Sequence, residues 1–251
     1  MSKIYAIITQ KGGVGKTTTV NALASAFSRQ GFRVLAVDMD PQGNLSFSTG
    51  ADGDAPTVYD ALTGGTRVES CIQQMEMTDI MPSNILLSGA ELEFSGKNRE
   101  FVLKNVLKVV GDEYDYIFID SPPGLGFLTV NALAASNYVI LPMLPDIFSL
   151  QGLIQVYETI EFVKKACNPE LEVAGILINK YRRFSKLHRE AVGTAQMVAE
   201  KFDIPIFDTF IRTSPQLSEA HSLQCSIYEY APRAAGVKDY MKLAAEILQS
   251  N

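Results

Sequence analysis

Cysteine is scarce in this sequence, and no two cysteines stand close together. Cys71, Cys167 and Cys225 are odd in number and form no Cys-x-x-Cys pair. A disulfide framework or a zinc site needs paired, closely spaced cysteines, so both are excluded. An iron–sulfur cluster held between two subunits is excluded by the same spacing. We therefore expect free, buried thiols and a reducing compartment.

Long hydrophobic runs and targeting segments are missing as well. No apolar run approaches the roughly 20 residues that span a bilayer, and Met1-Ser2-Lys3 leads directly into a strand pattern without a secretion signal. The formal net charge is −6, which argues against coating DNA through bulk charge but allows a local basic patch. We expect a cytoplasmic protein with one large domain over residues 1–251.

Short apolar runs alternate with helical patterns along the chain. Such runs indicate strands buried on both faces of a parallel sheet. The clearest are 4–8, 34–37, 116–119, 138–141 and 173–178, with weaker ones at 78–81 and 204–207. The helical patterns cover 17–30, 97–110, 150–166, 186–201 and 237–249. Their alternation predicts an α/β fold, a doubly wound and mostly parallel sheet flanked by helices.

A glycine-rich loop lies between the first predicted strand and the first predicted helix. Residues 11–18 read Lys-Gly-Gly-Val-Gly-Lys-Thr-Thr, which ends like the phosphate-binding pattern G-x-x-x-x-G-K-[ST]; Gln10 stands where that pattern has its first glycine. Glycine lets backbone N–H groups turn inward around phosphate oxygens, and a helix N-terminus adds a favourable dipole. The loop therefore predicts a P-loop NTPase.

Each residue of this loop has an expected task toward ATP and Mg²⁺. Lys16 would neutralise the β- and γ-phosphates, the Thr17 hydroxyl would bind Mg²⁺, and Thr18 would hold the α-phosphate region. The remaining cofactor-binding residues, which would surround the phosphates, are Lys11, Gly12, Gly13, Val14 and Gly15. The sequence thus predicts an ATPase that hydrolyses ATP to ADP and phosphate.

Carboxylates follow two of the predicted strands. Asp38 and Asp40 come after strand 34–37, and Asp120 ends the run 116–119. The carboxyl ends of parallel strands beside the phosphate loop face the nucleotide crevice. Asp120 is expected to hold Mg²⁺, while Asp38 and Asp40 would point toward Mg²⁺ and toward the attacking water. For Asp38 and Asp40 the alternative is a capped turn that binds no ligand, because Asp-Pro and Gly-Asn are common in turns.

The motifs together resemble the ParA/Soj family of partition ATPases, part of the ParA/MinD superfamily with its deviant Walker A loop. The likeness covers nearly the whole chain, without the N-terminal helix-turn-helix extension of larger plasmid ParA proteins. Besides the loop, it rests on Val-Asp-Met-Asp-Pro-Gln-Gly-Asn at 37–44, Asp-Ser-Pro-Pro-Gly at 120–124, Phe-Asp-Thr at 207–209 and Leu-Ser-Glu-Ala at 217–220.

The resemblance implies a homodimer with ATP sandwiched between the subunits. Lys11 would reach the partner subunit's nucleotide, and Asp40 would orient the attacking water. Lys11, Lys16 and Asp40 are then the expected catalytic residues. Thr17, Asp38 and Asp120 are the expected metal residues. Asn179, at the end of strand 173–178, would contact adenine, although a plain turn-forming role is equally open.

The resemblance also implies a switch in chromosome or plasmid partitioning. The ATP dimer would bind nonspecific DNA, associate with the nucleoid, and hydrolyse ATP when a ParB-like centromere-binding protein stimulates it. Gln216 replaces an arginine that contacts DNA in many members, so that contact does not carry over. A basic segment offers a substitute: Arg182, Lys186 and Arg189 would share a helix face and contact phosphates. A solvated helix start is the alternative.

Another interpretation is a MinD-like or other regulatory ATPase of the same superfamily that does not act on DNA. MinD-like proteins end in a short basic amphipathic helix that binds membranes. Residues 237–249 instead indicate a final helix packed against the core, with few cations. We therefore expect no membrane partner.

Overall fold

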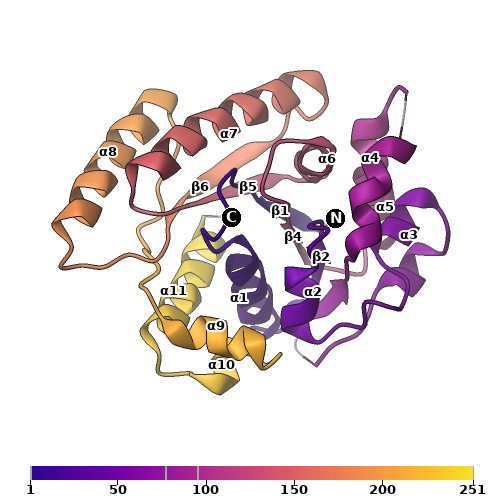
Figure 1. Cartoon of the computed structure of the whole chain (residues 1–251), viewed down its shortest axis with the longest axis horizontal. Coiled ribbons are helices and arrows are strands. Elements are labelled where there is room, and N and C mark those ends of the chain that lie inside the picture. The colour runs from indigo at the N-terminus through magenta and orange to yellow at the C-terminus, as the bar shows by residue number, and fades with distance from the viewer. Residues whose placement is uncertain (1, 77, 95, 251) are drawn as a thin grey trace.

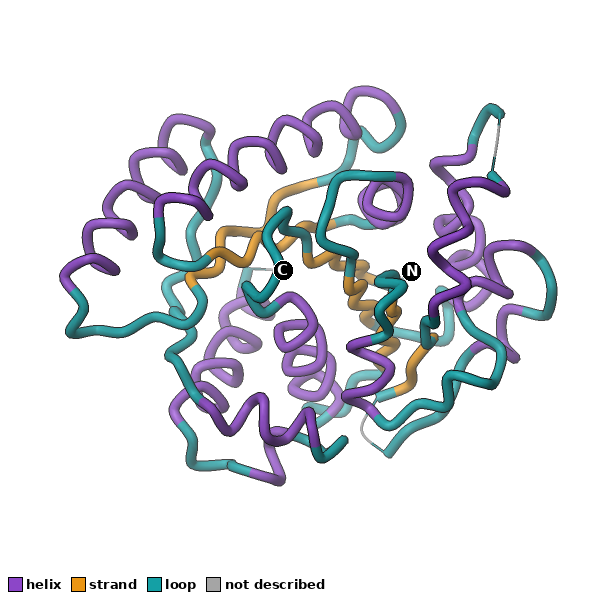
Figure 2. The backbone as a smooth tube through the Cα atoms, in the orientation of Figure 1, coloured by secondary structure: helices purple, strands orange, loops and turns teal. Residues whose placement is uncertain are grey.

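A six-stranded parallel sheet forms the centre of the computed structural model, which describes residues 2–76, 78–94 and 96–250 (Figures 1 and 2). The strand order is β3-β2-β4-β1-β5-β6, and all pairs are parallel. The bounds are β1 (Lys3–Ile7), β2 (Val34–Asp38), β3 (Asp79–Met81), β4 (Tyr116–Asp120), β5 (Tyr138–Met143) and β6 (Glu172–Ile178). The predicted α/β fold class is confirmed.

Helices cover both faces of the sheet, and the strand side chains alternate between the two cores. Tyr5 and Ile7 pack into one core, whereas Ala6 and Ile8 pack into the other. This double burial explains why the strands are apolar almost without interruption. The first core is closed by α1 (Lys16–Ser28), α9 (Pro215–Ser222), α10 (Ile227–Tyr230) and α11 (Ala235–Gln249). The second is closed by α5 (Val102–Val110), α6 (Phe127–Ala135), α7 (Ile147–Ala166) and α8 (Lys186–Phe202) (Figure 1).

Short helical elements connect the strands on the β3 side of the sheet. They are α2 (Asn44–Thr49), α3 (Val58–Thr63), α4 (Ala90–Glu93) and the 3₁₀ turns η1 (Val68–Cys71), η2 (Ile85–Gly89) and η3 (Arg99–Phe101). Local chemistry sets their ends: Thr57 and Asp60 form a capping box at the start of α3. Apart from η3, which lies within the helix predicted over 97–110, none of these elements is predicted, because segments this short show no clear helical periodicity.

Several predicted boundaries differ from the structure. The helix expected over 97–110 contains a break, since Asn98 has a φ of 69° and the turn η3 precedes α5. The helix expected over 150–166 begins earlier, because Asp146 caps it by accepting a hydrogen bond from the Ser149 N–H at 2.8 Å. The strand expected over 204–207 is wrong: only Ile206 forms an isolated bridge with β6.

The predicted burial of the thiols holds for Cys71 but not for Cys167 and Cys225, which are half-buried. Cys71, Cys167 and Cys225 are free thiols, of which Cys71 is fully buried. Across the described ranges, every helix is too short or too polar to pass through a bilayer. The final helix α11 packs against α1 and buries Val237, Tyr240 and Leu243 in the first core, as predicted for a core-packed end of the chain.

Candidate functional site

The glycine-rich loop joins β1 to α1 at the carboxyl edge of the sheet. Gly13 and Gly15 have φ angles of 72° and 99°, a region that favours glycine. A Cβ on Gly15 would lie 2.5 Å from the Asn179 amide nitrogen, so the close approach of β6 also requires glycine there. The α1 N-cap residue is Gly15 itself, without any side-chain cap. The first N–H groups of α1 are therefore free to bind an anion.

Lys16, Thr17 and Asp120 come together beneath this loop. The Thr17 hydroxyl donates a hydrogen bond to Asp120 Oδ2 at 2.6 Å, and Lys16 is only 8% exposed. Burial lowers the pKa of the Lys16 ammonium, while the charges of Asp120 and Asp40 act in the opposite direction. The structure therefore places Lys16, the lysine predicted to bind phosphate, close enough to Asp120 and Asp40 to feel their charges. Thr18 lies half-buried in the first turn of α1.

Asp120 ends β4 and is fully buried. Its Oδ1 atom has no hydrogen-bond partner among the described residues. Burial and the neighbouring Asp38 charge raise the pKa of Asp120 well above its ordinary value, against the Thr17 hydrogen bond and the Lys16 charge. A buried, unpaired carboxylate oxygen beside a hydroxyl is a costly arrangement that a hard cation relieves. The donor set of Thr17 and Asp120 fits Mg²⁺.

Asp38 and Asp40 follow β2 and have different environments. Asp38 is fully buried and accepts hydrogen bonds from the Asp40 N–H at 3.0 Å and from the Ser46 N–H and hydroxyl at 2.9 and 2.8 Å. Burial raises the pKa of Asp38 to about 6, partly offset by the Ser46 hydrogen bonds. Asp40 Oδ1 accepts from the Gln42 N–H at 3.0 Å. Asp38 thus organises the turn into α2, and its role toward metal stays a prediction.

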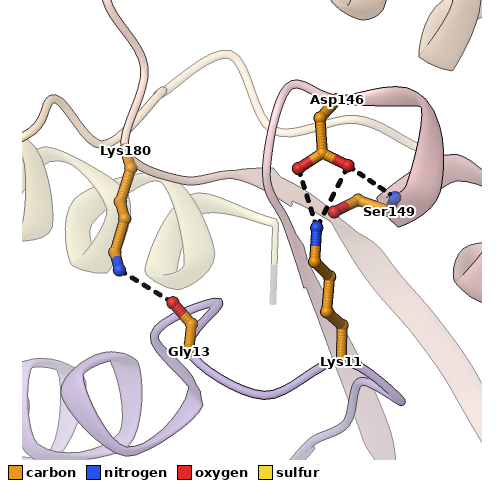
Figure 3. Close-up of polar contacts among 5 residues, drawn as sticks. All are labelled: Lys11, Gly13, Asp146, Ser149 and Lys180. Carbon is orange, nitrogen blue, oxygen red and sulfur yellow. Dashed lines mark hydrogen bonds and ion pairs between the residues drawn. The ribbon is translucent and has the colours of Figure 1, made fainter.

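Lys11 extends from the loop to the start of α7 (Figure 3). Its ammonium pairs with the carboxylate of Asp146 at 2.9 and 3.2 Å, and it lies 5.9 Å from the centre of the Phe148 ring. Asp146 is also the cap of α7. Within the chain the ion pair therefore ties Lys11 to the α7 cap, and the predicted reach of Lys11 into a partner subunit stays a prediction.

Asn179 and Lys180, directly after β6, hold two consecutive carbonyl groups of the loop. Asn179 Nδ2 donates to the Val14 carbonyl at 2.9 Å, and Lys180 Nζ donates to the Gly13 carbonyl at 2.8 Å (Figure 3). Asn179 is 3% exposed; its contact with adenine stays a prediction. Sequence reasoning missed Lys180, and the only signal was its place beside Asn179 at the end of a strand.

The predicted basic residues lie beyond this strand end, around the start of α8. Arg182 precedes α8, so it cannot share a helix face with Lys186 and Arg189 as predicted: Ser185 caps the helix, which begins at Lys186. Lys186 pairs with Glu190 at 3.6 Å, and Arg189 donates to the Arg183 carbonyl at 3.0 Å. These three cations lie on exposed positions.

The two histidines have no metal partners within the described ranges, where no cluster of three His, Cys, Asp or Glu residues could hold an ion. His188 accepts a hydrogen bond from the Arg182 N–H at 3.0 Å. His221, in α9, has a buried Nε2 atom without a hydrogen-bond partner among the described residues. Burial lowers its pKa to about 4.

Comparison with known sequences gives close relatives over the full chain. The model of a family described as AAA domain matches residues 2–173. The chromosome-partitioning ATPase Soj of Treponema pallidum is 39% identical over 251 residues, 99% of this chain and 98% of the relative. The sporulation initiation inhibitor protein Soj of Bacillus subtilis is 39% identical over 252 residues, 98% of each.

Solved structures with the same architecture include a synthase and a cell division ATPase. Cobyrinic acid a,c-diamide synthase from Mycobacterium smegmatis, solved with bound ADP and magnesium, is 32% identical with a TM-score of 0.87 and covers 99% of this chain and 95% of that chain. The cell division ATPase MinD from Pyrococcus furiosus is 27% identical with a TM-score of 0.82, and each chain is covered completely.

Proposed function

Because this chain belongs to the ParA/Soj family of partition ATPases, we propose that it is a dimerising, Mg²⁺-ATP-dependent switch in DNA segregation. It is an ATPase, and its cofactors are ATP and Mg²⁺. Residues 1–251 act as a single ATPase domain in this proposal. The observation that supports it most directly is the convergence of Lys16, Thr17 and Asp120 under one glycine loop.

Each side chain of this cluster has a distinct task in the proposed reaction. Thr17 and Asp120 would hold Mg²⁺, which would supply positive charge to the phosphates and shield them from the buried carboxylates. Lys16 supplies a buried positive charge to the β- and γ-phosphates. Asp40 orients the attacking water: Oδ1 is fixed by the Gln42 N–H, and Oδ2 has no hydrogen-bond partner within the described residues.

Lys11 completes the site across the interface of two subunits. A second cation beside the transferred phosphoryl group stabilises the charge of the transition state. The Lys11 side chain is 38% exposed. The neighbouring Phe148 is 72% exposed and offers apolar surface beside Lys11. Dimerisation would exchange the carboxylate of Asp146 for the partner's phosphates. ATP then favours the dimer only through contacts that ADP does not make.

The dimer is tested by light scattering after size exclusion. Asp40→Ala should slow hydrolysis and preserve the ATP state, so we expect a dimer with Mg²⁺-ATP and a monomer with Mg²⁺-ADP. Adding Lys11→Ala to this variant should return it to a monomer, because the cation across the interface is lost. An Asp40→Ala protein that stays monomeric under saturating ATP would contradict the sandwich and the role of Lys11.

We also infer that the ATP-bound dimer binds DNA, without sequence preference, through the basic segment 182–189. The segment carries Arg182, Arg183, Lys186 and Arg189 on exposed positions, and DNA phosphates attract such clusters without sequence preference. This binding would place the protein on the nucleoid. A ParB-like centromere-binding protein would stimulate hydrolysis and release it. A MinD-like membrane role has less support, because α11 buries its apolar residues against α1.

A further inference from the structure

We propose that Lys180 is a positioning residue that fixes and polarises the phosphate loop through the carbonyl group of Gly13. Its ammonium lies 2.8 Å from that oxygen, a contact between residues 167 positions apart (Figure 3). The inference deepens the proposed function, since it rests on the loop being the phosphate site. It concerns nucleotide binding by one subunit and is independent of dimerisation and DNA.

The backbone holds Lys180 in an unusual conformation. Its φ of 53° lies in the left-handed region, which is uncommon for residues other than glycine and persists where the surroundings enforce it. Its N–H donates to Asn179 Oδ1 at 3.0 Å, and its carbonyl accepts from the Thr213 hydroxyl at 3.0 Å. Tyr181 then donates its N–H to the Ile211 carbonyl at 2.8 Å. The strand end is thus held in the conformation in which the lysine reaches the loop.

Two neighbouring carbonyl groups of the loop are held in this way. Lys180 holds the Gly13 carbonyl and Asn179 holds the Val14 carbonyl. In a trans peptide the N–H points opposite to the C=O, and none of the described peptide bonds is cis. The N–H groups of Val14 and Gly15 must therefore point away from β6. Both N–H groups are thereby oriented for donation to a phosphate.

Charge distinguishes Lys180 from Asn179. The asparagine is a neutral amide, so it orients the peptide between Val14 and Gly15. The lysine also carries a positive charge, which draws electron density toward the Gly13 oxygen and makes the N–H of the same peptide a stronger donor. That N–H belongs to Val14. Lys180 therefore acts on the phosphate through one identifiable peptide group.

Lys180→Met keeps a side chain of similar length and removes the charge. We expect the variant to bind Mg²⁺-ADP about tenfold more weakly by calorimetry, because one charge-assisted hydrogen bond is lost. Lys180→Arg should restore most of the affinity. Lys165→Met, which changes an exposed lysine in the last turn of α7, should bind as the wild type does.

A nuclear magnetic resonance measurement separates positioning from a general loss of structure. In the Mg²⁺-ADP complex, the amide proton of Val14 should shift upfield in Lys180→Met, and the shift of Gly15 should change less. The proposal is overturned if Lys180→Met binds Mg²⁺-ADP like the wild type, if the Val14 resonance does not move, or if Lys180→Arg fails to restore binding. A wild-type protein that binds no Mg²⁺-ADP would overturn the proposed function itself.

Discussion

At the scale of single residues, burial sets the acid–base behaviour of groups both beside the nucleotide loop and away from it. His221, in α9, has a pKa lowered to about 4 by burial, against about 6.5 in an unfolded chain. The folded state therefore binds fewer protons than the unfolded state between these values, and stability rises with pH there. Asp38 has the opposite effect, because its raised pKa of about 6 lowers stability as the pH rises toward that value.

His221→Leu isolates the histidine from these opposing effects. Between pH 7 and pH 4, we expect the free energy of unfolding of the nucleotide-free wild type to fall relative to the variant by about 2 to 3 kcal/mol. The stabilising neutral imidazole is fully effective near pH 7 and is lost as the pH falls toward 4. Urea denaturation of both proteins at four pH values measures this difference. A difference that does not depend on pH would show that His221 titrates normally in the fold.

Single residues of the site were predictable where their chemistry is local in sequence. Gly15, Lys16 and Thr17 form one motif, and Asp120 is recognisable because an apolar strand ends at it. Lys180 was not predictable, since its contact joins β6 to a loop 167 residues earlier and no spacing rule describes that distance. The ion pair between Lys11 and Asp146 was missed for the same reason, because the two residues are 135 positions apart.

At the scale of elements, two arginine–aspartate pairs have the same geometry and differ in burial. Arg212 donates its N–H, Nε and Nη2 to Asp239 at 3.0, 2.8 and 2.7 Å and thereby joins the segment between α8 and α9 to α11. Arg33 donates the same three groups to Asp115 at 2.9, 3.3 and 2.7 Å. The side chain of Asp239 is 6% exposed and that of Asp115 is 37% exposed.

The pair with the buried carboxylate should be the costlier one to break. We expect Asp239→Ala to lower the free energy of unfolding by about 2 kcal/mol, because it removes a buried acceptor of three hydrogen bonds, one of them from the Arg212 backbone N–H. Asp115→Ala is the matched control and should cost less, since water replaces the lost carboxylate at the surface. Thermal and urea denaturation of both variants measure the order. Equal losses would show that burial does not set the strength of these pairs.

The longest helices and the buried strands were predictable, whereas α6, with nine residues, and α9, with eight, were not. Five clear strands and five long helices gave patterns that the structure largely reproduces, because both faces of each strand are covered. The strand prediction for residues 204–207 was wrong because Ile204 and Phe207 are buried without belonging to a strand. The short elements α2, α3 and α4 were missed because each has six residues or fewer.

At the scale of the whole molecule, the distribution of charge matters more than its sum. The chain carries a formal charge of −6, yet Arg182, Arg183, Lys186 and Arg189 gather on exposed positions around the start of α8. DNA bound there would release counterions, so the affinity should fall steeply with salt. The fold class was predictable at this scale because the alternation of strands and helices is global.

Replacing Arg182, Lys186 and Arg189 together with glutamine should abolish ATP-dependent DNA retention and leave ATP hydrolysis without DNA unchanged. These side chains lie outside the nucleotide cluster, and at least three phosphate contacts would be lost. Retention on DNA across a salt titration, with the hydrolysis rate measured in parallel, checks both parts. A matched triple change of Lys104, Lys108 and Lys165 should keep DNA retention. If the first variant retains DNA like the wild type, the DNA-binding surface lies elsewhere.

The long-range anchoring of the phosphate loop also constrains when the protein becomes active during its synthesis. The loop and Thr19 lie near the start of the chain, but their anchors are Asn179, Lys180 and Tyr240, whose hydroxyl is 3.0 Å from that of Thr19. At about 5 to 20 residues per second, roughly 11 to 45 s pass between translation of the loop and translation of its last anchor. A nascent chain that stops before Asn179 contains the loop sequence but lacks the residues that hold the loop in its conformation. The phosphate loop is therefore translated early and reaches its final conformation late.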